Sequence, residues 1–271
     1  MKNRLVSVII PTKNSAKTMD LCLKSIVKQS YSNIEIVVVD GYSDDITPDI
    51  TEKYNANYIA CDSERCTARN LGAEQSKGDF LCFIDSDMEL ERSVIEECIT
   101  KMRDNDISSV IIPEISVGEG FWTNCKALER SCYIGDDTIE AARFFRREVF
   151  DEIHGYDENL ISGEDWDLSQ RAKATGGKCV RISSLIRHHE GKLSLLKTMK
   201  KKFYYSHFIK NYMIKNPQMA KKQLTFIRPA YIRNWKRLIR HPILTVGFMF
   251  MKTCEFAAAG VGIVLVRIND E

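Results

Sequence analysis

Short β-rich runs alternate with amphipathic helical patterns along the first part of the chain. The strand-like runs are Leu5–Ile10, Ile34–Val39, Asn57–Ala60, Phe80–Ile84 and Ser108–Ile115. The helical patterns are Ser15–Gln29, Asp44–Tyr54, Thr67–Ser76 and Ser93–Arg103. Such alternation is typical of βαβ units, in which helices cover both faces of a mostly parallel sheet. We therefore predict an α/β fold with a Rossmann-like central sheet.

Polar loops follow three of these predicted strands. The loops are Pro11–Asn14, Asp40–Asp45 and Asp85–Asp87, and the last two carry clustered carboxylates. Open parallel sheets bind their ligands beyond the carboxyl ends of the strands. We therefore expect a ligand site at this edge of the sheet.

Two acidic clusters contain residue types suited to catalysis. Asp85 and Asp87 leave an apolar strand as an Asp-x-Asp pair, which suits a divalent cation that also binds phosphate oxygens. The same pair would fit an exposed turn that caps a helix. Glu164 and Asp165 open a predicted helix, where acids also interact favourably with the helix dipole. Either cluster taken alone leaves both interpretations open.

The cysteines and the amino terminus indicate a reducing compartment. Nine cysteines are an odd number, and none forms a Cys-x-x-Cys pair. Several, such as Cys82 and Cys98, lie inside apolar runs, which favours packed thiols over disulfides or zinc. The basic residues in the first four positions are not followed by the long apolar run of a secretory signal. We expect the catalytic part to stay in the cytosol.

Several motifs occur in an order that resembles the family 2 glycosyltransferases of the GT-A fold. They span roughly residues 5–190 and are Val6–Asn14, Glu35–Asp45, Ala68–Gly72, Gly78-Asp79, Asp85–Asp87, Phe145–Phe150, Gly155–Glu158 and Gly163–Asp165. Any one of them recurs by chance, whereas the ordered series is specific. The resemblance implies a GT-A catalytic domain over residues 1–191. Residues 1–115 would be its nucleotide-sugar-binding half and 116–191 its acceptor half.

The resemblance also implies roles for residues on the donor side. Asp40 would accept a hydrogen bond from the nucleobase, in a pocket lined by Pro11, Thr12 and Lys13. Arg69 would meet the base or the diphosphate, although an ordinary exposed helix residue is the alternative at this position. A site of Mn²⁺ or Mg²⁺ is implied as well, and its expected ligands are Asp85, Asp87 and His188, with His189 as the alternative histidine.

On the acceptor side, the resemblance makes Asp165 the catalytic base of an inverting transfer. Glu164 would orient or contact the acceptor, and Trp166 and Asp167 would be structural. The Gln-x-x-Arg-Trp motif of processive synthases is missing, because Arg233-Asn234-Trp235 has neither its order nor its position. We therefore expect one sugar to be transferred per encounter.

The carboxyl-terminal region, residues 192–271, differs in charge from the rest of the chain. Residues 178–241 hold 17 lysines and arginines against one acid, a net charge of +16. Because the whole chain has 39 basic and 37 acidic residues, the remainder has 22 against 36, a net charge of −14. Lys197–Tyr212 mixes basic and aromatic residues, and Ile243–Val266 is apolar apart from Lys252 and Glu255, which are spaced to pair.

These features favour a membrane surface over nucleic acid as the partner of this region. A spanning helix, a helix in the interface and a helix buried against a partner subunit, as in a homo-oligomer, all stay open. The expected protein is a glycosyltransferase at the cytoplasmic face of the membrane. It would move a sugar from a UDP- or GDP-linked donor to a lipid-linked or glycan acceptor. A nucleotidyltransferase and an inactive sugar-nucleotide-binding scaffold are the alternatives.

Overall fold

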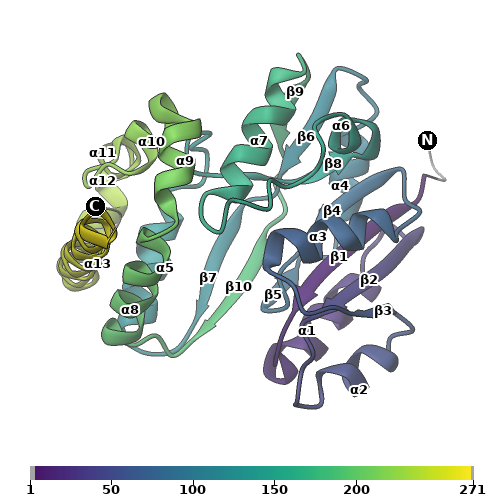
Figure 1. Cartoon of the computed structure of the whole chain (residues 1–271), viewed down its shortest axis with the longest axis horizontal. Coiled ribbons are helices and arrows are strands. Elements are labelled where there is room, and N and C mark those ends of the chain that lie inside the picture. The colour runs from purple at the N-terminus through teal and green to yellow at the C-terminus, as the bar shows by residue number, and fades with distance from the viewer. Residues whose placement is uncertain (1–3, 270–271) are drawn as a thin grey trace. The chain divides into compact units, whose positions relative to one another are not determined.

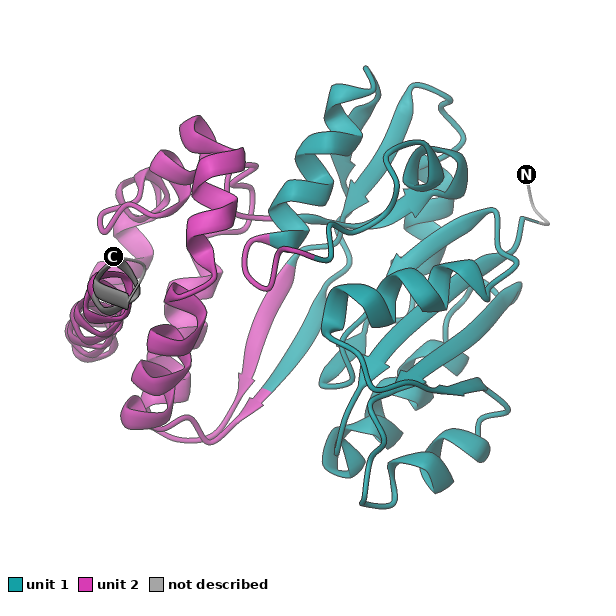
Figure 2. Cartoon of the chain, viewed as in Figure 1, with its two compact units in different colours: residues 1–113, 141–158, 164–189 teal, residues 114–140, 159–163, 190–271 magenta. Residues whose placement is uncertain are grey.

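The computed structural model describes residues 4–269, with side chains up to residue 264. The chain forms two compact units, shown in separate colours in Figure 2. Unit 1 comprises residues 1–113, 141–158 and 164–189, and unit 2 comprises residues 114–140, 159–163 and 190–271. Each unit therefore draws on several segments that are distant in the sequence.

A mostly parallel sheet forms the centre of unit 1 (Figure 1). Its order is β3-β2-β1-β4-β8-β6-β9 within the described residues. The strands are β1 (Val6–Thr12), β2 (Ile34–Asp40), β3 (Asn57–Ala60), β4 (Phe80–Phe83), β6 (Ile107–Ile111), β8 (Ala142–Arg146) and β9 (Lys178–Arg181). Only β8 among them runs antiparallel to its neighbours, β4 and β6. The predicted α/β class with a mostly parallel sheet is thus confirmed.

Helices cover both faces of this sheet, and the alternation of side chains along β1 shows why. Val8 and Ile10 belong to one apolar core and Ile9 to the other, because successive strand residues point to opposite faces. The first core includes α1 (Ala16–Val27) and α4 (Val94–Lys101). The second includes α3 (Arg65–Glu74), α6 (Arg147–Glu152) and α7 (Glu164–Ala174). A shorter helix, α2 (Thr47–Glu52), packs against α1.

Two predicted elements differ in detail. The expected strand Ser108–Ile115 is interrupted, since β6 ends at Ile111 and β7 (Glu114–Gly118) begins after Pro113. Proline has no backbone N–H and cannot continue a strand ladder on that side. The expected helix Asp44–Tyr54 is shorter in the structure, since α2 runs from Thr47 to Glu52 and the Asp45 carboxylate accepts the Thr47 N–H at 2.9 Å in the turn before it.

The chain continues beyond β4 into a smaller sheet with the strand order β5-β10-β7. Within it, β5 (Met88–Leu90) pairs antiparallel with β10 (Ile186–Gly191), and His188 lies opposite Met88. The pairing places the histidines beside the residues that follow Asp85. It therefore brings two segments about a hundred positions apart to the same edge.

Unit 2 is mainly helical in its described part. Besides β7, its elements are α5 (Phe121–Ser131), α8 (Leu195–Ser206), α9 (Ile209–Lys215), α10 (Pro217–Gln223), α11 (Pro229–Arg233), α12 (Trp235–Arg240) and α13 (Pro242–Asn269). The long helix α13 packs on α5 and α8. Residues 242–264 of α13 are long and apolar enough to cross a membrane, judged by length and composition only. Of the predicted apolar run, Leu265 and Val266 are described by backbone alone.

The predictions for the cysteines and for the charged pair in α13 are confirmed. All nine cysteines lie among the described residues as free thiols, most of them buried. Lys252 and Glu255 form an ion pair with Nζ 3.3 Å from Oε2. Burial raises the pKa of the Cys82 thiol to about 12, so this thiol stays protonated and acts as packing.

Candidate active site

The loops after β1 and β2 form one side of the site, because Thr12 lies beside Asp40 in the parallel register. Asp40 is fully buried. Its carboxylate accepts hydrogen bonds from the Ser43 N–H at 3.0 Å, the Ser43 hydroxyl at 2.5 Å and the Tyr58 hydroxyl at 2.7 Å. A carboxylate has about four lone-pair positions. Asp40 therefore keeps room for about one further donor.

The other predicted residues of this side are also at the sheet edge. Pro11 and Thr12 are buried at the end of β1, and Lys13 is exposed just beyond it. The Thr12 hydroxyl oxygen is buried and has no hydrogen-bond partner among the described residues. Buried polar atoms are normally paired, so an unpaired one calls for an explanation such as a ligand.

Strained backbone marks the same two loops. Asn14 and Tyr42 both adopt positive φ, 52° and 54°, which residues with a side chain rarely do. The Asn14 N–H donates to the Ser43 hydroxyl at 2.7 Å and its side-chain oxygen accepts the Asp44 N–H at 2.9 Å, so the loops hold each other. Tyr42 is left with an exposed ring beside Asp40. No feature of the sequence singled out Tyr42.

Arg69 connects the two acidic clusters at the centre of unit 1. Its side chain is only 1% exposed, so the alternative of an ordinary exposed helix residue is wrong. Nη2 lies 2.8 Å from Oδ1 of Asp85, while Nη1 lies 3.1 Å from Oδ1 of Asp165. Nη1 is also 3.5 Å from Oε1 of Glu164. The planar fork of the guanidinium suits such simultaneous contact with several carboxylates.

The residues around Arg69 explain how α3 reaches this position. A Cβ at Gly72 would lie 2.5 Å from Cγ2 of Ile9, so only glycine allows α3 to approach β1 this closely. Asn70 binds a distant loop, since its amide donates to the Tyr156 carbonyl at 2.9 Å and accepts the Tyr156 N–H at 2.8 Å. The loop turns at Gly155, whose φ of 64° favours glycine. The Ala68–Gly72 motif thus builds the frame of the site.

Asp85 is held ionised by two arginines. Burial would raise its pKa, but Arg69 and then Arg143 outweigh this effect and keep the pKa well below the ordinary value of 3.8. Nη2 of Arg143, on β8, lies 3.7 Å from Oδ2 of Asp85. Sequence reasoning missed Arg143, because nothing in the run Ala142–Arg146 separates a site arginine from a surface one.

Asp165 begins helix α7 with its neighbour Glu164. The Tyr156 hydroxyl donates to Oδ1 of Asp165 at 3.2 Å, and the ring of Tyr156 lies 5.0 Å from the Arg69 guanidinium. Tyr156 is a second residue that sequence reasoning assigned no role. Burial and the adjacent Asp165 raise the pKa of Glu164 above its usual 4.5. Asp165 thus lies between Arg69 and Tyr156 with 28% of its side chain exposed, whereas the side chain of Glu164 is 9% exposed.

Helix α7 continues after these acids with Trp166 and Asp167. Asp167 is buried and accepts a hydrogen bond from Nε of Arg171 at 2.7 Å. This pair lies one helical turn apart on α7, and Nη1 of Arg171 also donates to the Ile153 carbonyl at 2.7 Å. Trp166 is half-buried.

Asp87 and His188 lie together at the half-exposed end of the site. The Nε2 atom of His188 is 3.1 Å from Oδ2 of Asp87. His189 turns to the opposite side of β10, where its Nε2 lies 3.0 Å from Oε2 of Glu89. Of the two histidines, His188 therefore faces the Asp-x-Asp pair.

A divalent cation near Asp87 and His188 would find few protein ligands. Among residues 4–269, no group of three or more His, Cys, Asp and Glu side chains is arranged to hold a metal. Asp87 and His188 offer one oxygen and one nitrogen, and Asp85 is engaged by its arginines. Mg²⁺ is commonly held by one or two carboxylates together with substrate phosphates. The donor set fits a cation that arrives with a diphosphate.

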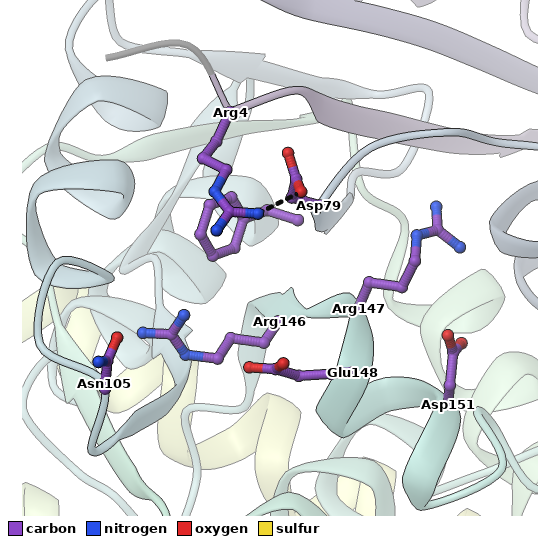
Figure 3. Close-up of a pocket in the computed structure, with 8 residues that line it drawn as sticks. Arg4, Asp79, Asn105, Arg146, Arg147, Glu148 and Asp151 are labelled. Carbon is purple, nitrogen blue, oxygen red and sulfur yellow. Dashed lines mark hydrogen bonds and ion pairs between the residues drawn. The ribbon is translucent and has the colours of Figure 1, made fainter. Parts of the chain in front are cut away.

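A separate hollow of unit 1 lies at the amino end of β4, away from these residues (Figure 3). It has a volume of about 410 Å³, and Arg4, Arg146 and Arg147 line it. The arginines are already bound. Arg4 pairs with Asp79 at 2.6 Å, while Arg146 and Arg147 donate mainly to backbone carbonyls between the end of α4 and the start of β6 and between the last turn of α3 and β4. The arginines of this hollow therefore hold the ends of neighbouring helices, and the hollow is not the anion site.

The fold places the protein in a known class. It matches the mannosyltransferase PcManGT from Pyrobaculum calidifontis, solved with GDP-Man and Mn²⁺, with a TM-score of 0.69 and 14% identity, over 96% of this chain and 87% of that one. It matches Staphylococcus aureus TarS 1-349, solved with UDP-GlcNAc, with a TM-score of 0.56 and 16% identity, over 98% and 92% of the two chains. The architecture is that of the GT-A glycosyltransferases.

The sequence then identifies the family. Residues 7–155 match the profile described as glycosyl transferase family 2, and the chain belongs to that family. Glycosyltransferase AglE of Haloferax volcanii is 27% identical over 188 residues, which are 63% of this chain and 62% of that protein. The amylovoran biosynthesis glycosyltransferase AmsB of Erwinia amylovora is 26% identical over 211 residues, 68% of each chain. The chain thus matches somewhat less than two thirds of the length of AglE.

Proposed function

We propose that the protein is an inverting, non-processive glycosyltransferase. It would transfer one sugar from a UDP- or GDP-linked donor to a lipid-linked or glycan acceptor at the cytoplasmic face of a membrane. The observation that carries this proposal is the bridge made by Arg69 between Asp85 and Asp165. It joins a carboxylate of the donor side to the proposed base through a buried arginine.

The donor nucleotide is proposed to bind at the ends of β1 and β2. Asp40 has about one acceptor position left for a nucleobase N–H, and the unpaired Thr12 hydroxyl is available to a ribose or base. The exposed ring of Tyr42 can stack on the base, and Lys13 can reach the diphosphate as a flexible cation. Strained loops such as these are frequent at ligand sites.

The diphosphate is proposed to lie between Arg69 and the pair Asp87–His188. When bound there, Mn²⁺ or Mg²⁺ would neutralise the charge that develops on the leaving nucleoside diphosphate. Asp87 and His188 are the proposed protein ligands of that ion, with Asp85 in support. PcManGT was solved with GDP-Man and Mn²⁺, which supports a divalent ion in this fold.

Asp165 is proposed to act as the base. The acceptor hydroxyl oxygen forms the new bond to the anomeric carbon, the bond to the diphosphate oxygen breaks, and the hydroxyl proton passes to Asp165. The Tyr156 hydroxyl and Arg69 fix the orientation of the Asp165 carboxylate. Glu164 is proposed to contact the acceptor, because its carboxyl group lies directly beside the proposed base and 3.5 Å from Nη1 of Arg69.

A donor screen tests this function. The protein is incubated with nucleotide sugars and Mn²⁺, and release of UDP or GDP and the shift in melting temperature are measured. One nucleotide class should stabilise the protein and be hydrolysed slowly, and chelator should abolish both effects. Nucleotide binding without turnover for any donor and acceptor would favour the inactive scaffold, and release of pyrophosphate would favour a nucleotidyltransferase.

A further inference from the structure

An uncharged face of α13 is left exposed within unit 2. Its exposed residues recur every three or four positions, which places them along one side of the helix. We call them the outer stripe: Ile243, Val246, Phe250, Thr253, Ala257, Val261 and Val264. Val246 is 71% exposed and Phe250 55%, and the stripe contains no charged side chain. Exposed apolar surface of this extent marks an interaction site.

A groove adjoins the outer stripe. It lies between the first turns of α5 and α13, and its volume is about 520 Å³. Its lining is apolar and includes Phe121, Trp122, Ile243, Val246 and Phe250. Phe121 and Trp122 lie edge to face, 5.0 Å apart, and the Trp122 ring stacks on Phe250 at 6.2 Å. The groove extends the apolar surface from α13 onto α5.

The inner face of α13 is fixed to α5 by buried charges. Nζ of Lys252 lies 2.5 Å from Oε1 of Glu129 and 3.3 Å from Oε2 of Glu255. Lys126 completes the cluster, 2.9 Å from Glu129 and 3.8 Å from Glu255. For α13 to leave α5 and cross a bilayer, Lys252 and Glu255 would enter the hydrocarbon, and Glu129 would lose Lys252, its nearest cation, and keep only Lys126, which is costly.

The bundle as a whole cannot cross a bilayer either. A spanning helix needs about 20 predominantly apolar residues, whereas α5 is only 11 residues long and α8 only 12, polar residues included. Helix α8 also carries Lys200, Lys201 and Lys202. The apolar side of α13 can therefore meet lipid only along its length.

Helix α12, which directly precedes α13, has the composition of a headgroup zone. No residue of α12 is buried. Trp235 and Ile239 expose their side chains next to the cations Lys236, Arg237 and Arg240. Such a mixture of aromatic, aliphatic and basic side chains suits an anionic lipid surface, where each cation contributes about fivefold to binding.

We propose that unit 2 docks on an anionic bilayer with α13 parallel to the membrane plane. The outer stripe and the groove enter the outer hydrocarbon layer, and the cations of α12 lie among the lipid phosphates. The proposal rests on the proposed function only in that a lipid-linked acceptor would be met at this surface. It distinguishes an in-plane helix from the spanning helix that its length alone would allow.

Vesicle binding by the full chain tests the surface. Sealed vesicles of phosphatidylcholine with phosphatidylglycerol should bind the protein, and added salt should weaken but not abolish binding. Val246→Asp should lower the partition coefficient at least tenfold. The matched control is Val27→Asp on α1, where the valine is 60% exposed but belongs to no such stripe, and its binding should stay within twofold of the wild type.

Depth measurements test the orientation. In a Trp166→Phe background, lipids brominated near the headgroup end of the chains should quench Trp122 and Trp235 more strongly than lipids brominated near the methyl end. A protease-sensitive tag at the carboxyl terminus should stay accessible from outside the vesicles. A protected tag, or stronger quenching at depth, would show a spanning helix and overturn the proposal.

Two further results would also overturn it. The first is vesicle binding by Val246→Asp that equals that of the wild type. The second is a wild type that does not bind vesicles and instead forms dimers that Val246→Asp dissociates, which would make the stripe a subunit interface. Donor hydrolysis by Val246→Asp keeps the two proposals separate, because it should equal that of the wild type. A protein that binds vesicles but processes no donor would reject the proposed function and leave the surface standing.

Discussion

The Nη2 atom of Arg69 lies 2.8 Å from Oδ1 of Asp85, and the arginine side chain is only 1% exposed. The same guanidinium reaches Asp165 at 3.1 Å. Arg69→Met would leave these carboxylates without their main counter-charge. We expect a loss of about 2–4 kcal/mol in the free energy of unfolding at neutral pH. This is less than for a fully buried pair, because Asp85 and Asp165 keep 24% and 28% exposure.

The pH dependence of this loss separates charge from packing. The folded state lowers the pKa of Asp85, so its contribution to stability is present above the ordinary value of 3.8 and is lost as the pH falls toward the lowered value. In Arg69→Met that contribution is missing, so the gap to the wild type should be widest at neutral pH and narrow below about pH 4. Arg4→Met, at the exposed pair with Asp79, should cost less than about 1 kcal/mol. Urea unfolding at several pH values measures both, and a gap that is constant with pH would contradict the charge explanation.

Asp87 and His188 are predicted to make donor binding depend on metal. Asp87→Ala should abolish the increase in nucleotide affinity that Mn²⁺ produces and should stop transfer, because no side chain would compensate for the lost ligand. His188→Ala should weaken the same effect about 10- to 100-fold. The control is His189→Ala, since His189 faces Glu89 and not Asp87. Calorimetric titration of UDP and GDP with and without Mn²⁺ decides the matter, and equal affinity in excess chelator would refute it.

Asp165→Asn should separate chemistry from donor binding. The amide keeps the size of the side chain but cannot take a proton, so transfer should fall about 10²–10⁴-fold while nucleotide affinity stays within a few-fold. Asp151→Asn on α6, an exposed acid away from the site, should leave both unchanged. Single-turnover assays with a hydroxyl acceptor provide the measurement. An Asp165→Asn variant with wild-type turnover would exclude Asp165 as the base.

Much of the fold could be predicted because its signals are local. The alternation along Val6–Ile10 and the polar residues after each strand fix which face is buried and where a strand ends. The antiparallel strand β8 between β4 and β6 was not predicted. Its place in the sheet depends on long-range pairing of Phe144 with Cys82 and Val110, which no local pattern specifies.

Some residues of the candidate site could likewise be found from local sequence signals, and others could not. Asp40, Asp85 and Asp87 follow strands and could be found from the sequence. The helical pattern around Arg69 does not show that its guanidinium is enclosed by acids from two distant segments. Arg143 and Tyr156 reach the site from separate segments, so their roles depend on tertiary packing alone.

Gly72 allows the close approach of α3 to β1 and should not tolerate a side chain. A Cβ there would lie 2.5 Å from Ile9 and 3.2 Å from Val39, so Gly72→Ala should lower the free energy of unfolding by about 1–3 kcal/mol. Gly260→Ala is the matched control in α13, where nothing lies within 4 Å of the added Cβ. Helix propensity should make that variant more stable, by up to about 1 kcal/mol. If Gly72→Ala and Gly260→Ala had equal free energies of unfolding, α3 would be able to shift freely on the sheet to make room for the added methyl group.

A buried charge cluster joins α5 and α13 within unit 2. The Glu129 carboxylate lies 2.5 Å from Nζ of Lys252 and 2.9 Å from Nζ of Lys126, and its side chain is 1% exposed. The Tyr133 hydroxyl donates to it at 2.5 Å. Burial would raise the pKa of Glu129, but Lys126 and Lys252 outweigh it and hold the pKa well below 4.5. The cluster should therefore stabilise the unit above about pH 4.5 and lose this contribution as the pH falls below that value.

A double-mutant cycle measures how strongly α13 is held by this cluster. Glu129→Met and Lys252→Met should each cost about 3–5 kcal/mol at neutral pH, because each removes the nearest counter-charge of a buried ion. The double variant removes both charges and keeps the Lys126–Glu255 contact, so it should be about 1–3 kcal/mol more stable than the sum of the single losses predicts. Urea unfolding followed by the fluorescence of Trp122, with Trp166 and Trp235 replaced by phenylalanine, reports on unit 2. Strictly additive losses would mean that the Glu129 and Lys252 side chains do not stabilise each other.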